Sequence, residues 1–380
     1  MTEQIFTNAK IVLANDVIDG AVQIKDGIIT DVSDRASNLL GAEDMGGDYL
    51  MPGLVELHTD NLDKHLTPRP KTRWPATAAV IAHDNQVASA GITTVFDAVS
   101  IGDVNEGSER IVRLVESVEA LAHAQDNNLL RADHKLHLRC ETSFPGMIEA
   151  LGTLVEMPLV KMLSVMDHTP GQRQFVSLEA YYTYYQGKYG LNDEEMRKFV
   201  ATRRRDSELY SAKHRRHVVE TAHAKGLALA SHDDATNAHV AEAVADKMTV
   251  AEFPTTLEAA KASHEAGLGV MMGGPNLVRG GSHNGNVAAG DLAKNGYLDI
   301  ISSDYVPHSL LHGAMKLFDD FNEYDLPRAI RTVSLNPATQ VDLTDRGEIA
   351  VGKRGDLIRV HHSPHHPIVR GVWREGVRVS

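Results

Sequence analysis

The sequence predicts an α/β fold, a (β/α)8 TIM-like barrel with a small composite β-sandwich domain formed from both termini. Three observations predict it. Eight short apolar runs alternate with helical patterns along the middle of the chain, and most of these runs end in a polar or ionisable residue. Both ends of the chain consist of short strand-like segments joined by tight turns. An open doubly wound sheet is the alternative that the same alternation leaves open.

The two ends of the chain share one pattern of short strands. The strand-like runs there are residues 10–14, 21–25, 28–32, 356–360 and 369–379. Asp26-Gly27 and Glu375-Gly376 are hairpin turn signals. We therefore expect one small β-domain from residues 1–50 and 345–380, attached to a hydrolase barrel at residues 51–344.

The middle of the chain supplies the expected barrel strands. They are residues 54–58, 92–99, 136–141, 161–168, 227–232, 248–253, 269–272 and 298–304. Helical patterns separate most of them, and residues 109–125 are an example with an apolar face. The connection between His168 and Leu227 is oversized. It predicts either a lid over the active face or a helical excursion that is solvated or contacts another subunit.

Composition restricts the classes of function. The chain has 380 residues, a formal net charge of −13, 20 histidines and a single cysteine, Cys140. One cysteine excludes an internal disulfide and a thiolate metal cluster, so a metal site must use imidazole and carboxylate. The negative charge argues against nucleic acid or an anionic membrane as the main partner. The chain lacks a membrane-spanning apolar run and signal-peptide features, so we expect a cytoplasmic protein. A homo-oligomer remains open.

Ionisable residues follow the predicted strands at the face where such barrels place their catalytic groups. They are Glu56, His58, Asp60, Glu141, His168, His232, Asp233, Glu252 and Asp304. Imidazoles and carboxylates from separate strands are what a divalent metal centre needs. His58 and Asp60 are two residues apart and point the same way in an extended segment. We therefore expect metal ligands at this face.

Each of these residues also has a structural interpretation. Asp304 could cap a helix, and His58 could bond to backbone at a strand end. Glu141 could form an ion pair with Arg139, and His168 could belong to a turn. Glu252 could lie behind the ligands. The histidines without a positional argument, expected to be structural or exposed, are His83, His134, His137, His239 and His283.

Basic residues lie in three loops that follow predicted strands. They are Lys64, Arg69, Lys71, Arg173 and Arg279. Glycines beside the last two let backbone N–H groups approach an oxyanion, and arginine grips phosphate with two hydrogen bonds. A single such residue usually faces solvent, but three loops with this chemistry predict an anionic, phosphate-rich substrate.

Several stretches closely resemble the PhnM family of bacterial phosphonate degradation, which belongs to the amidohydrolase superfamily. They are MPGLVELHTDNLDKHLTPRPKTRWP, DHTPGQRQF, LASHDDAT, AEFPTT, PNLVRGGSHNGNV and ISSDY, and the likeness covers nearly the whole chain. The resemblance implies a diphosphatase that converts α-D-ribose 1-methylphosphonate 5-triphosphate to the 5-phosphate and pyrophosphate, ahead of carbon–phosphorus lyase.

The resemblance also implies two divalent metal ions. Zn²⁺ is the expected metal, with Mn²⁺, Fe²⁺ and Mg²⁺ as alternatives. The ligands would be His58, Asp60, Glu141, His168, His232 and Asp304. Glu141 would bridge the ions, and Asp304 would also act as general base. The chain departs from the wider superfamily pattern in three places. The first motif is His-x-Asp rather than His-x-His, and the sixth strand offers Glu252 in place of histidine. The fourth strand has no lysine at the position where a carboxylated lysine is expected.

Two other functions remain as alternatives. The same metals would suit hydrolysis of a C–N bond in a cyclic amide, deaminase or deacetylase substrate. A neutral amide, however, would not need the basic residues in the three loops described above. A non-catalytic barrel scaffold would be expected to lack ligands, yet His58, Asp60, His232 and Asp304 are all present.

Overall fold

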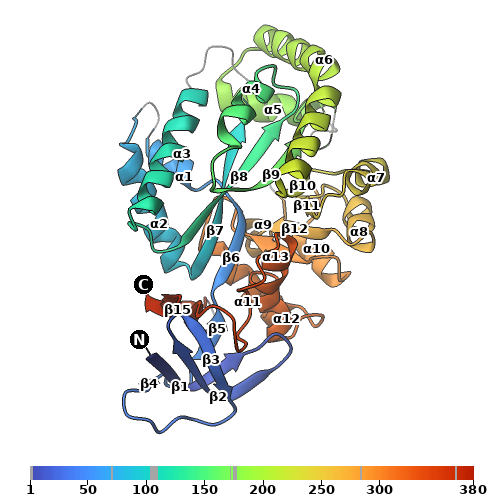
Figure 1. Ribbon diagram of the computed structural model, residues 1–380. Helices are drawn as coiled ribbons and strands as arrows, with labels where there is room; N and C mark the ends of the chain where they lie inside the picture. Colours follow the sequence, from blue (N-terminus) through green and yellow to red (C-terminus); the bar gives the residue numbers. More distant parts are fainter. Residues whose placement is uncertain are drawn as a thin grey trace.

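The computed structural model describes residues 3–69, 72–102, 110–171, 173, 178–282, 285–363 and 366–380. Eight parallel strands form a nearly closed barrel, in the order β13-β12-β11-β10-β9-β8-β7-β6, which confirms the expected fold (Figure 1). The strands are β6 (Leu54–Thr59), β7 (Ile92–Ile101), β8 (Asp133–Glu141), β9 (Val160–Met166), β10 (Ala228–His232), β11 (Val250–Glu252), β12 (Gly269–Gly273) and β13 (Ile300–Ser302). Each falls on one of the eight predicted runs.

The barrel closes between its first and last strands at their carboxyl ends. Thr59 and Asp304 form a parallel bridge there. The Asp60 N–H donates to the Asp304 carbonyl at 3.2 Å, and the Asp304 N–H donates to the His58 carbonyl at 3.1 Å. These bonds bring two of the predicted site segments together.

Strand alternation separates the inside of the barrel from the outside. Val55, Leu57 and Phe96 belong to a buried cluster that fills the barrel. On β8, Leu136, Leu138 and Cys140 pack instead into the outer cluster with α3 and α4. Cys140 is fully buried, and burial raises the pKa of its thiol.

The helices lie between and after the barrel strands along the chain. They are α1 (Leu62–Leu66), α2 (Ala76–Ser89), α3 (Arg110–Asp126), α4 (Met147–Leu154), α5 (Leu178–Tyr189), α6 (Asp193–Lys225), α7 (Asn237–Ala245), α8 (Leu257–Glu265), α9 (Gly274–Arg279), α10 (Ala289–Lys294), α11 (Ser309–Asp320), α12 (Leu326–Arg331) and α13 (Leu335–Gln340). Within the described parts of the chain, no helix is long and apolar enough to cross a membrane.

The long connection after β9 contains α5 and α6. Asn192 begins α6 with a capping box, in which its side chain accepts from the N–H groups of Glu194 and Glu195. Gly226 ends the helix in the left-handed conformation, at φ 63°. These signals delimit a helix of 33 residues, far longer than its neighbours. Figure 1 shows it at the end of the molecule opposite both termini.

The two ends of the chain form a second sheet, as expected. Its strands are β1 (Glu3–Val12), β2 (Val17–Lys25), β3 (Ile28–Ser33), β4 (Glu43–Asp44), β5 (Tyr49–Pro52), β14 (Leu357–His361), β15 (Ile368–Arg374) and β16 (Val377–Arg378). β5 pairs antiparallel with β14, and hydrogen bonds link all eight strands in one sheet. Both predicted hairpin turns are present: Asp26 and Gly27 have φ of 49° and 83°, and Glu375 and Gly376 have φ of 49° and 71°.

The second sheet and the barrel share a hydrophobic core. Met51 and Val360 of the sheet lie in the same buried cluster as Leu54 and Ile92, which begin barrel strands. The terminal sheet therefore packs against the amino ends of barrel strands and leaves the carboxyl ends to the site.

Candidate metal centre

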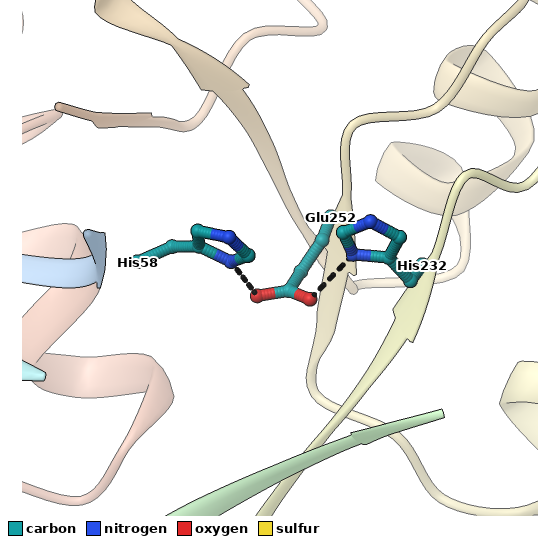
Figure 2. Close-up of side chains that lie close together, drawn as sticks. All are labelled: His58, His232 and Glu252. Carbon is teal, nitrogen blue, oxygen red and sulfur yellow. Dashed lines mark hydrogen bonds and ion pairs between the residues drawn. The ribbon is translucent and has the colours of Figure 1, made fainter. Parts of the chain in front are cut away.

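Two histidines and one glutamate meet inside the barrel mouth (Figure 2). His58 is the second-last residue of β6, while His232 ends β10 and Glu252 ends β11, and all three side chains are buried. The Nδ1 atoms of His58 and His232 each lie 3.0 Å from a different oxygen of Glu252. Burial opposes ionisation of Glu252, but the neighbouring imidazoles hold its pKa well below the usual value. An ionised carboxylate can only accept, so both rings donate through Nδ1 and present Nε2 for a cation.

A second group shares His232. The Nε2 atoms of His168 and His232 lie 3.6 and 3.4 Å from Oδ2 of Asp233. That oxygen is buried and has no hydrogen-bond partner in the described chain. A buried carboxylate oxygen faced by two imidazoles fits a divalent cation. Both groups have the composition and spacing of a metal site.

Glu141 ends β8 and anchors His168. One Glu141 oxygen lies 2.6 Å from Nδ1 of His168, and the other accepts from the Ser143 hydroxyl at 2.7 Å. Arg203 of α6 lies 3.5 Å from this second oxygen. Burial opposes ionisation, but the charges of His168 and Arg203 lower the pKa of Glu141 to about 2. In this arrangement Glu141 orients His168. That Glu141 bridges two metal ions stays a prediction.

Asp304 lies beside these groups, two residues after the end of β13. It adopts a left-handed backbone, with φ of 53°. Burial, together with the charge of Asp60, raises the pKa of Asp304 to about 6. Asp60 is half-buried and joins the Asp304 backbone across the barrel seam. The structure thus brings all six predicted ligands to one end of the barrel.

Glu56 holds the same seam together. One of its oxygens accepts from the His58 N–H at 2.6 Å, and the other accepts from the Ser303 N–H. The side chain is fully buried, and burial raises the pKa of Glu56 to about 8. Glu56 therefore supports the strands that carry His58 and Asp304.

The predicted phosphate-binding cations lie in different settings. Arg69 and Arg279 are exposed, and Lys71 lies outside the described residues. Lys64 donates to the Tyr305 carbonyl, with its Nζ 5.0 Å from the centre of the Tyr305 ring. It is therefore attached to the loop that follows Asp304.

The prediction that Arg173 binds phosphate needs correction. Its side chain is buried and pairs with Asp234, and it also lies 3.4 Å from Glu242 and from the His232 carbonyl. Its charge is therefore already neutralised by carboxylates, because the segment after β9 folds onto the end of β10. We assign Arg173 a structural role there.

Sequence reasoning undervalued three residues of this centre, namely His137, Asp233 and Glu252. Nδ1 of His137 lies 3.0 Å from the Leu57 carbonyl, while its buried Nε2 lies 3.6 Å from Glu252 and has no hydrogen-bond partner among the described residues. Burial lowers the pKa of His137 to about 3, so the ring is neutral. Period-two alternation was an available signal, since His137 and Glu141 lie on one face of β8.

Another buried network lies outside the barrel, beneath α2. Asp97 of β7 accepts from Nε2 of His83 and from Nδ1 of His134, both at 2.7 Å. Nε2 of His134 lies 3.3 Å from Asp84, and Asn61 donates to Nδ1 of His83 at 3.0 Å. Each of these ring nitrogens already has a partner, so the geometry favours a hydrogen-bonded network over a metal site.

The comparisons agree with this structure. No protein-family model matches the chain. It is 47% identical over 376 residues, covering 99% of this chain and 100% of the relative, to the α-D-ribose 1-methylphosphonate 5-triphosphate diphosphatase of Escherichia coli strain K12. The structure is similar to an amidohydrolase (TM-score 0.63, 16% identity, 99% and 98% coverage). It is also similar to the 5-methylcytosine deaminase of Klebsiella pneumoniae (TM-score 0.65, 15% identity, 99% and 98% coverage). The chain therefore belongs to the α-D-ribose 1-methylphosphonate 5-triphosphate diphosphatase family and has the amidohydrolase fold.

Proposed function

We propose that this protein hydrolyses α-D-ribose 1-methylphosphonate 5-triphosphate to the 5-phosphate and pyrophosphate, with two divalent metal ions at the barrel mouth. The observation that carries the proposal is the 47% identity that extends over the whole of the diphosphatase relative. The buried imidazoles and carboxylates at the strand ends support it, because they suit a cation and lie at the catalytic end of the barrel.

The proposed ligands come from separate strands. They are His58, Asp60, Glu141, His168, His232 and Asp304, as predicted, with Asp233 added because its oxygen faces two of these imidazoles. Glu252 would fix both His58 and His232 from behind. The bound ions would neutralise phosphate charge and make a water molecule acidic near neutral pH. We favour Zn²⁺, and Mn²⁺, Fe²⁺ and Mg²⁺ remain open for this ligand set.

The residues of the chain would activate water and bind the leaving group. Asp304 would take a proton from the water that attacks the phosphorus nearest the sugar. One P–O bond forms there as the bond to the bridging oxygen breaks, and pyrophosphate departs with that oxygen. Catalysis of phosphoryl transfer depends mainly on positioning and on electrostatic stabilisation. The triphosphate would be attracted by the basic residues in the loops around the barrel mouth, namely Lys64, Arg69, Lys71 and Arg279.

Phosphorus NMR tests the proposal directly. The purified protein, loaded with metal or treated with chelator, is mixed with the ribose triphosphate, and a panel of cyclic amides is run in parallel. We expect pyrophosphate and the 5-phosphate only with metal present. Amide turnover without pyrophosphate would refute the diphosphatase proposal and favour ordinary C–N hydrolysis on the same barrel.

A further inference from the structure

Strand β8 places an arginine side chain on the inner face of the barrel. Leu138 and Cys140 point outward into the cluster formed with the covering helices. The residues that alternate with them therefore point inward. The contacts of two such residues agree with this: Nε2 of His137 lies 3.6 Å from Glu252, and Glu141 lies 2.6 Å from Nδ1 of His168. Arg139 lies between these two in the same alternation, so its guanidinium enters the barrel mouth beside the candidate metal centre.

Arg139 has no partner in the described parts of the chain. No hydrogen bond or ion pair engages it there, and its Nε is buried without an acceptor. Two other buried arginines near the site are occupied, since Arg173 pairs with Asp234 and Arg203 donates to Ser143. Guanidinium groups at protein interiors are almost always paired, so an unpaired one in a reaction site is suited to an anionic ligand.

We propose that Arg139 is a catalytic residue that binds the oxygens of the phosphoryl group under attack and of the departing pyrophosphate. This assignment rests on the proposed diphosphatase function. A guanidinium can donate two parallel hydrogen bonds to phosphate, and these bonds strengthen as negative charge moves onto the bridging oxygen. A position on a barrel strand also holds the group more rigidly than that of Arg69 on an exposed loop or of Arg279 at the exposed end of α9.

The variants Arg139→Lys and Arg139→Ala test the assignment, with Arg205→Ala on the exposed side of α6 as the matched control. We expect Arg139→Ala to lower kcat by about 10²–10³-fold, as loss of one charge-stabilising donor does. Arg139→Lys keeps the charge but loses the paired donors, so its activity should lie between those of Arg139→Ala and the parent protein. Added guanidinium should restore part of the Arg139→Ala activity, while metal content and melting temperature stay unchanged.

Pyrophosphate binding, measured by calorimetry on the metal-loaded protein, separates this assignment from the proposed function. Weaker pyrophosphate binding in Arg139→Ala would support the anion site even if the parent protein did not cleave the ribose triphosphate. Activity and pyrophosphate affinity within about threefold of the parent would overturn the assignment. A loss of activity that follows loss of metal would overturn it as well, because Arg139 would then act on the ligands instead of the substrate.

Discussion

At the scale of single residues, the site depends on unusual backbone conformations at strand ends. Asp233, Phe253 and Asp304 have φ of 57°, 52° and 53°, and they follow β10, β11 and β13. A left-handed backbone conformation in a residue other than glycine costs roughly 1–3 kcal/mol of conformational free energy, and residues with this conformation are concentrated at functional sites. With this turn, Oδ2 of Asp233 lies 3.6 and 3.4 Å from Nε2 of His168 and His232.

Asp304→Asn should remove most of the activity and leave the fold intact. Asparagine tolerates the left-handed conformation but cannot accept a proton as carboxylate does, so kcat should fall by about 10²–10⁴-fold. Steady-state assays of pyrophosphate release, with circular dichroism, measure both effects. Asp342→Asn is the matched control, because Asp342 has φ of 58° and is exposed. Activity in Asp304→Asn equal to that of the control would refute the general-base role.

The network beneath α2 predicts a loss of stability in alkali. Burial alone would lower the pKa of His134, but Asp97 and Asp84 outweigh burial and raise the pKa to about 9. The raised pKa means that the folded state holds this proton more tightly than the unfolded state. The stabilisation is therefore complete below the unfolded pKa of roughly 6.5 and disappears as pH rises through about 9.

Urea unfolding of the parent protein and of His134→Gln measures this effect. We expect the difference in unfolding free energy between them to shrink by about 2–3 kcal/mol between pH near 7 and pH near 10. His223→Gln, at an exposed position of α6, should show no such change. An equal difference at both pH values would mean that His134 is not a buried cation.

At the scale of elements, α6 connects the long insertion to the site. Ser207 and Ser211 donate to one oxygen of Asp167, at 3.1 and 2.9 Å. Arg203 donates to the Ser143 hydroxyl, and Nδ1 of His214 lies 2.9 Å from the Thr142 carbonyl. Spacings of three and four residues put these side chains on one face of the helix. That face fastens the segments that follow β8 and β9, next to Glu141 and His168.

Replacing both serines by alanine tests this attachment. Ser207→Ala/Ser211→Ala leaves Asp167 with fewer donors, and hydrogen bonds to an ionised group contribute about 1.5–3 kcal/mol each when buried. Asp167 is only half-buried, so we expect a total loss of about 1–3 kcal/mol in unfolding free energy. The control is Thr202→Ala, on the exposed side of the same helix. Equal denaturation midpoints in the two variants would show that α6 is not fastened through these bonds.

The sequence predicted elements better than contacts between them. Local periodicity marks the barrel strands, and Asp26-Gly27 specifies its turn by itself, so these were correct. Arg173 was misjudged because its partner Asp234 is 61 residues away and depends on how the insertion folds. Glu252 could be assigned to a strand end, but its bonds to His58 and His232 arise only once β6, β10 and β11 share one barrel. Long-range pairing of this kind leaves no local signal.

At the scale of the whole molecule, the residues of the candidate metal centre come from strands on opposite sides of the barrel. Removal of bound metal by chelation should therefore abolish activity and lower the melting temperature. At a metal concentration about 100 times Kd, binding stabilises a fold by about 3 kcal/mol. Calorimetry with and without added divalent ion measures this increment, and restored activity identifies the effective metals. A melting temperature and activity indifferent to chelation would contradict the proposed centre.

Glu252→Gln should reduce the stabilisation that metal provides. The amide cannot accept from both imidazoles as the carboxylate does, and loss of such an orienting partner typically weakens metal affinity about 10–100-fold. Titration of metal into the parent protein, Glu252→Gln and the exposed control Glu265→Gln compares the affinities directly. Unchanged affinity in Glu252→Gln would remove Glu252 from the centre.

The buried position of Cys140 makes the protein convenient for spectroscopy. It is the single cysteine of the chain, it faces the covering helices, and burial raises the pKa of its thiol. Thiol-reactive dyes need an accessible thiolate, so they should not label the folded parent protein. A cysteine introduced at exposed Thr202 would then carry a dye alone. The fluorescence of this dye would report whether α6 moves when the ribose triphosphate binds. A change on binding would indicate that α6 is a mobile lid, and no change would indicate that it is a fixed support for the segments after β8 and β9.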